Sequence, residues 1–134
     1  MQFILAATLS LHVLAATFWA GTSFTLARLG GAGGEKLFRP QMGAAVLVVL
    51  TGGYLWHLVH EGSFGTTEQL LAAGALCAIV AAGVQGAIGG RAIRALRNGA
   101  VGETDAREKI ATAQRIGAAL LAIAAVCMGA ARYL

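Results

Sequence analysis

The sequence predicts an all-α fold, an integral membrane bundle of four helices, and two observations predict it. The first is composition, because 57% of the 134 residues are hydrophobic, 12% are charged and the mean hydropathy is +0.72. A soluble domain of this size needs a more charged surface. The second is segmentation, because four apolar stretches approach the roughly 20 residues that cross about 30 Å of hydrocarbon. We therefore expect residues 1–134 to form a single transmembrane domain.

The expected spans cover residues 3–26, 42–60, 70–90 and 113–131. The first span has no basic n-region and is too long for the apolar core of a signal peptide, so we expect it to be retained as a helix. Arg115 falls in the first turn of the last span, from where its side chain is expected to reach the membrane surface.

Small residues recur at every fourth position of the third and fourth spans. The third span has Gly74, Ala78, Ala82, Gly86 and Gly90, and the fourth has Ala118, Ala122 and Ala130. In lipid, such ridges mark helix faces that pack closely against another helix. The partner helix could belong to the same chain, to a second copy in a homodimer or to another membrane subunit.

The charged residues predict the orientation of the bundle. Between the spans, lysine and arginine occur only in the first and third loops, whereas the second loop carries only Glu61 and Glu68. The positive-inside rule places the first and third loops in the cytoplasm. Both termini are then expected outside, in the periplasm, for a multi-pass protein of a bacterial inner membrane. The formal charge of +4 comes from these loops, so the lipid bilayer and not nucleic acid is the expected partner.

His12 is the first candidate functional residue. It lies about ten residues into the first span, and nothing charged precedes Arg28. An ionisable side chain at that depth is costly and usually has a functional role. At a rise of about 1.5 Å per residue, His57, His60, Cys77 and Cys127 also fall in the outer half of the membrane. The sequence thus predicts a site in the outer leaflet.

Haem b explains this arrangement best, because its iron accepts neutral imidazole as an axial ligand. We expect His12 and His57 to be the two ligands, since their depths differ by only about 5 Å. His60 is a weaker candidate metal ligand, nearer the membrane surface. Small residues next to the two ligands would give the porphyrin room; they are Thr8, Ala16 and Ala20 in the first span and Gly53 in the second. Alternatively, His57 and His60 belong to an interfacial belt with Tyr54 and Trp56.

Residues 11–29, LHVLAATFWAGTSFTLARL, resemble the first helix of small bacterial four-helix membrane proteins. They are similar to the HemJ-type protoporphyrinogen oxidases and to the CopD-type copper-resistance membrane domain, in which a histidine precedes a tryptophan-glycine motif. His12, Trp19 and Gly21 match that motif. The resemblance implies a four-helix bundle with haem b at His12, or copper handling. The HemJ type has a functional lysine in its third helix, where this chain has no lysine and Gln85 is the nearest polar residue, so protoporphyrinogen oxidation is not expected.

Three functions therefore remain open. The first is a redox or electron-transfer role with haem b, which includes that of a membrane oxidoreductase. The second is copper handling through His12, His57, Cys77 and Cys127, since imidazole and thiolate suit copper, although the CxxC or Met-rich spacing of a copper chaperone is missing. The third is a non-catalytic accessory subunit of a larger membrane complex, in which His12 makes only an interhelical hydrogen bond.

Overall fold

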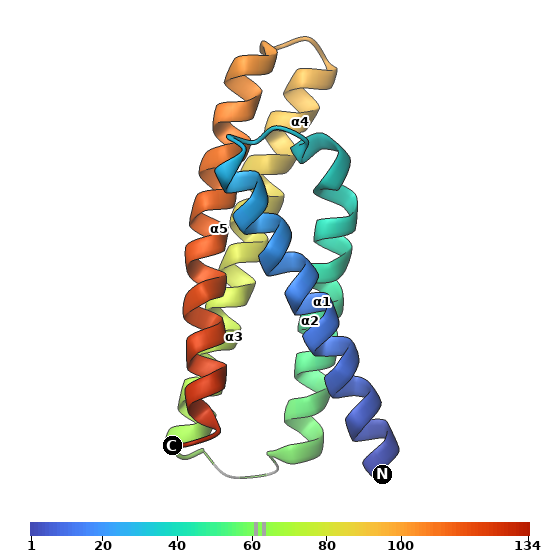
Figure 1. Cartoon of the computed structure of the whole chain (residues 1–134), viewed down its shortest axis with the longest axis vertical. Coiled ribbons are helices and arrows are strands. Elements are labelled where there is room, and N and C mark those ends of the chain that lie inside the picture. Colours follow the sequence, from blue (N-terminus) through green and yellow to red (C-terminus); the bar gives the residue numbers. More distant parts are fainter. Residues whose placement is uncertain (61, 63) are drawn as a thin grey trace.

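The computed structural model describes residues 1–60, 62 and 64–134, and in that part of the chain all regular structure is helical (Figure 1). The elements are α1 (Gln2–Arg28), α2 (Gly34–Val59), α3 (Thr66–Val84), the π-helical η1 (Gln85–Gly89), α4 (Gly90–Arg97) and α5 (Glu103–Ala131). Because α3, η1 and α4 continue as one helix, the chain forms a four-helix bundle. Each of the four helices is long and apolar enough to cross a membrane. The predicted all-α membrane bundle is confirmed at this level.

The helices extend beyond the apolar spans at the end of the bundle opposite the termini. Residues 34–41, which the sequence assigns to a loop, form the first two turns of α2 and include Pro40. The last helix begins at Glu103, so Arg115 lies three turns into α5 and not in its first turn. A helix satisfies its own backbone groups in water as well as in lipid, and the edge of the hydrocarbon therefore need not end it.

The turn between α1 and α2 depends on glycine. Gly30, Gly31 and Gly33 have φ values of 63°, 84° and 88°, which residues with a Cβ rarely adopt. The Gly31 N–H donates to the carbonyl of Leu26 over 2.9 Å and closes the end of α1. A Cβ at Gly31 would overlap the backbone carbonyl of Arg107. The turn therefore lies directly against α5.

The small-residue ridge of the third helix is used within the chain. Toward the end of the bundle that holds the termini, a Cβ on Gly74 would lie 3.1 Å from the carbonyl oxygen of Ala124 in α5. Toward the opposite end, a Cβ on Gly86 would lie 3.6 Å from Met42, and one on Gly90 would lie 3.3 Å from the ring of Phe38. The ridge thus packs first on α5 and then on α2.

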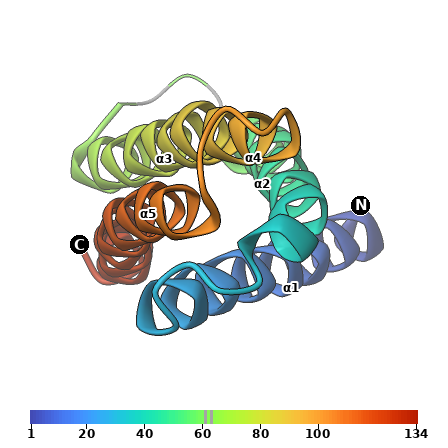
Figure 2. The ribbon, with the colours of Figure 1, turned by 90° about the horizontal axis from the view of Figure 1, so that it is seen from above.

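The bundle opens toward the end that holds both termini. Its central core comprises Ala15, Trp19, Ala45, Val48, Ala78, Ala81 and Leu121. Beyond Ala15 in α1 and Thr51 in α2 no described residue of these two helices is buried, whereas α3 has buried residues as far as Glu68 and α5 as far as Ala131. Figure 1 shows the pairs α1–α2 and α3–α5 diverging at this end, and Figure 2 shows α1 crossing the bundle obliquely.

Candidate functional site

His12 lies on the inward face of α1, in line with the buried residues Ala15, Trp19 and Ser23. Its Nδ1 atom is 2.8 Å from Oγ1 of Thr51 in α2. The same hydroxyl lies 2.6 Å from the carbonyl oxygen of Leu47, which can only accept, so the hydroxyl proton is directed there. A neutral His12 would then donate from Nδ1 and keep the lone pair on Nε2.

A glycine of α2 allows the imidazole to approach so closely. A Cβ on Gly52 would lie 3.2 Å from Cε1 of His12, a distance at which the ring would have to move. His12 itself is half-buried and stands where the packed core ends and the bundle opens. Thr51 and Gly52 together fix the orientation of the ring at this position.

His57 is not brought to His12. It is exposed and lies six residues beyond Thr51, which turns it about 120° away from that side chain. It shares its face of α2 with Leu50 and Gly53, which are also exposed. No heavy atom lies within 4 Å of a Cβ built on Gly53. The glycine next to His12 is therefore Gly52, while Gly53 and His57 face outward.

The other small residues assigned to the site lie on the inner side of α1. Thr8 is half-buried and lies one turn before His12 in α1. Ala16 and Ala20 are half-buried and pack against the central core. Thr8, His12 and Ala16 thus share one face, as the sequence indicates. Ala20 lies next to Trp19, within the packed part of the bundle and away from its opening.

Trp19 lies two turns after His12 in α1. It fills the core and has an exposed fraction of 0%. Its Nε1 donates to Oε1 of Gln85 over 2.6 Å. Gln85 opens the π-helical segment η1, and its Nε2 donates to Ser23 over 2.8 Å and to Gln114 over 3.1 Å. Gln114 in turn pairs with Gln41 of α2. A buried amide network, comprising Trp19, Ser23, Gln41, Gln85 and Gln114, therefore joins all four helices of the bundle.

The sequence considerations missed the contributions of Gln41, Ser23 and Thr51. A glutamine near the inner end of each of the last three spans was the available signal, because a buried amide in lipid needs a partner. Spacing alone does not show that three amides on different helices meet. In the part of the chain that the structure describes, every buried polar side-chain atom has a hydrogen-bond partner.

His60 forms a separate contact at the end of the bundle that holds the termini. Its Nδ1 lies 3.0 Å from Oε1 of Glu68 at the start of α3. The other carboxylate oxygen accepts from the N–H of Gly65 over 2.9 Å and caps the helix. The Trp56 ring lies 5.4 Å from the His60 ring, between ring centroids. His60 thus joins the end of α2 to the start of α3 and does not contribute to the His12 site.

No three His, Cys, Asp or Glu side chains converge among the residues that the structure describes. Cys77 and Cys127 are half-buried free thiols, and the Cβ atom of Cys127 would lie 3.3 Å from a Cβ on Gly74, where α5 packs on α3. At the opening of the bundle, His12 is placed where its neutral imidazole could bind a metal ion through Nε2. One imidazole suits a haem iron, whose other four in-plane ligands come from the porphyrin.

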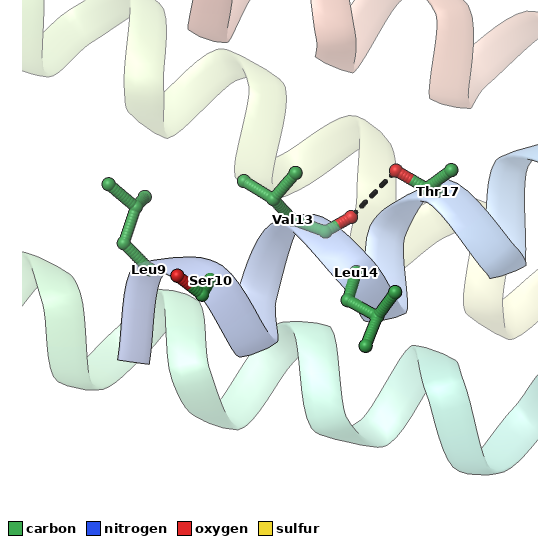
Figure 3. A pocket seen from close by; sticks show the side chains of 5 residues that line it. All are labelled: Leu9, Ser10, Val13, Leu14 and Thr17. Atoms are coloured by element: carbon green, nitrogen blue, oxygen red, sulfur yellow. Dashed lines mark hydrogen bonds between the residues drawn. The ribbon is translucent and has the colours of Figure 1, made fainter. Parts of the chain in front are cut away.

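A shallow hollow lies on the other side of α1, lined by Leu9, Ser10, Val13, Leu14 and Thr17 (Figure 3). All five residues belong to one helix, and the Thr17 hydroxyl donates to the carbonyl of Val13 over 2.8 Å. His12 does not line this hollow, which is part of the apolar outer surface of α1.

The fold and the site define a four-helix protein with membrane-spanning character, an inward-facing histidine and a buried amide network. Comparison of the chain with family models, with curated proteins and with solved structures gives no match.

Proposed function

We propose that this chain is a haem-b-binding protein of a bacterial inner membrane with a redox or electron-transfer role, and that His12 supplies an axial ligand. The observation that carries the proposal is the hydrogen bond from His12 Nδ1 to Thr51. Ligating histidines characteristically donate their second ring N–H to an oxygen, which fixes the ring and leaves the other nitrogen for the metal. Bound haem would supply a one-electron couple of the iron; the protein's part is to hold and orient it.

The placement of His12 supports the same function. A porphyrin needs a gap between helices, and His12 stands where α1 and α2 stop packing against α3 and α5. Gly52 removes the side chain that would push the imidazole aside. His57 remains a candidate second ligand only toward a haem held on the outer face of α2 or between two copies of the chain, because it faces outward.

The orientation that we propose places both termini outside. Of the ten lysines and arginines, only Arg132 lies at the end of the bundle that holds the termini. The other nine lie at the opposite end, which the positive-inside rule assigns to the cytoplasm. His12 would then bind its cofactor in the outer half of the membrane.

The visible spectrum of the purified protein tests the proposal. The chain is expressed with sufficient haem, purified in detergent and measured oxidised and reduced. We expect a Soret band that is lost in His12→Ala and retained in His57→Ala. Absence of the band from the wild-type protein, or its persistence in His12→Ala, would contradict the haem function. Metal analysis of the same samples tests copper, whose binding would also have to depend on His12.

A second candidate function, that of an accessory subunit of a larger membrane complex, is favoured by the outer half of α1. From Gln2 to Leu14 no residue of this helix is buried, and Phe3 has an exposed fraction of 91%. Such a surface is available to lipid or to another membrane protein. Mild extraction followed by affinity purification distinguishes the two functions, since a subunit without a cofactor would co-purify with one large partner and show no Soret band.

A further inference from the structure

Four exposed arginines, one from each helix of the bundle, lie in the half of the bundle opposite the termini. They are Arg28, Arg39, Arg91 and Arg115, and we refer to them as the basic collar. Contacts between neighbouring helices relate these arginines in two pairs. Gly31, one turn beyond Arg28, lies against Ala111 of α5, one turn from Arg115. Gly90, next to Arg91, lies against Phe38, next to Arg39.

The collar arginines are not neutralised by the protein. In the described parts of the chain, the ion pairs are Arg107 with Glu103 and His60 with Glu68, and neither includes a collar residue. Nine of the ten lysines and arginines lie at this end, against four acids: Glu35, Glu103, Asp105 and Glu108. This end of the bundle therefore carries a net positive charge of five (nine minus four).

Exposed apolar side chains adjoin the collar on the side of the membrane. Phe24, with an exposed fraction of 50%, lies one turn before Arg28, and Ile88, with 37%, lies one turn before Arg91. Ile116 is next to Arg115 and is also exposed. The guanidinium groups thus stand at the border between the apolar surface and water. Phosphate groups of lipids lie at this depth, and long basic side chains reach them by extending along apolar surface.

Arg115 also lines a shallow hollow between the glycine turn and α5, together with Gly30, Glu108, Ala111 and Thr112. Glu108 lies two turns of α5 further from the membrane than Arg115, so a headgroup that enters from the bilayer meets the arginine first. An acidic soluble protein would instead be attracted to the tip of the hairpin of α4 and α5, where Arg94 and Arg97 are more accessible from water.

We propose that the basic collar binds the headgroups of anionic phospholipids in the adjacent leaflet. Each arginine near the membrane surface contributes about 1 kcal/mol of attraction, which corresponds to about a fivefold change in affinity. This inference does not depend on the haem function, because it concerns other residues at the other end of the bundle.

Native mass spectrometry and thermal unfolding of the full chain in detergent micelles test the inference. The micelles contain phosphatidylglycerol or phosphatidylcholine with identical acyl chains. We expect the wild-type protein to retain phosphatidylglycerol preferentially and to unfold at a higher temperature with it, and high salt to reduce both effects. Each single substitution to glutamine, such as Arg91→Gln or Arg115→Gln, should lower the retention about fivefold.

Arg132→Gln is the matched control, because it removes a cation from the opposite end and should keep the preference. Using the single variants together with circular dichroism separates loss of lipid binding from loss of folding. Equal retention of the two lipids by the wild-type protein would overturn the inference, and so would an equal loss in Arg132→Gln. Binding of a polyglutamate peptide at concentrations where phosphatidylglycerol is not retained would identify a protein-docking surface instead.

Discussion

Gln41 and Gln114 form a reciprocal amide pair across the bundle. Nε2 of Gln114 donates to Oε1 of Gln41 over 2.8 Å, and Nε2 of Gln41 donates to Oε1 of Gln114 over 3.1 Å. Both side chains are buried. Because α2 and α5 are joined here by two hydrogen bonds, the pair fixes both the distance and the register of these helices. It also anchors Gln85, which donates to the same oxygen of Gln114.

Replacing one member of the pair should cost more than replacing both. Gln114→Leu leaves the Oε1 atom of Gln41 buried without its donor, and an unsatisfied buried polar atom costs about 1–3 kcal/mol. In the double variant Gln41→Leu/Gln114→Leu neither partner remains, and part of that loss should be recovered. We expect a coupling energy of about 0.5–1.5 kcal/mol, which a double-mutant cycle of unfolding free energies in detergent measures.

Thr112→Val is the control for this cycle. The Thr112 hydroxyl is exposed and bonds only to the carbonyl of Glu108 in its own helix. Its loss should change the free energy of unfolding little. Strictly additive effects of the two glutamine substitutions would show that the reciprocal pair does not hold α2 and α5 together.

The sequence predicts the helices of this chain better than the contacts between them. Span length and hydropathy are local properties, so the four helices can be recognised without knowledge of the tertiary structure. The position of His57 depends on which face of α2 turns inward, and the sequence of α2 does not distinguish the faces because lipid-facing and inward-facing positions are both apolar. The position of each histidine along its helix can be read from the sequence, but the contact of His12 with Thr51 rather than with His57 depends on helix rotation. The contact of Gln41 with Gln114 was not predictable in the same way, because the sequence assigns residue 41 to a loop.

Gly117 should tolerate no side chain, because a Cβ at this position would overlap the amide of Gln85. Gly117→Ala must displace Gln85 from Trp19 and Ser23, or move α5 away from η1. Overpacking of a tight core typically costs about 1–3 kcal/mol. The free energy of unfolding should fall by that amount, and the fluorescence of Trp19 should shift, since its indole loses a short hydrogen bond.

Gly129→Ala provides the comparison in the same helix. No heavy atom lies within 4 Å of a Cβ at Gly129, and alanine is a better helix former than glycine. This variant should be at least as stable as the wild-type protein. If Gly117→Ala proved equally stable, the close approach of Gln85 to α5 would be wrong.

Alanine substitutions at Gly30 and Gly31 distinguish backbone strain from steric overlap. Both have positive φ, so alanine at either position incurs about 1–2 kcal/mol of backbone strain. At Gly30 a Cβ would meet nothing within 4 Å, whereas at Gly31 it would overlap the carbonyl of Arg107. We expect Gly31→Ala to destabilise the protein clearly more than Gly30→Ala in thermal unfolding. Equal effects would mean that the turn does not lie against α5.

Thr51→Val tests the role of the hydroxyl that accepts from His12. Valine keeps the shape of threonine and removes the acceptor, so the imidazole loses the bond that directs its Nδ1 proton toward α2. If His12 is an axial ligand, loss of such a supporting bond should weaken cofactor affinity about 10–100-fold and shift the reduction potential of the iron. Titration of the apoprotein with haem measures the affinity, and a spectroelectrochemical titration measures the potential. Thr17→Val removes a hydroxyl from the exposed face of α1, away from Thr51, and should change neither quantity. Haem binding that is unaltered by Thr51→Val but lost in His12→Ala would retain His12 as a ligand and remove Thr51 from the site.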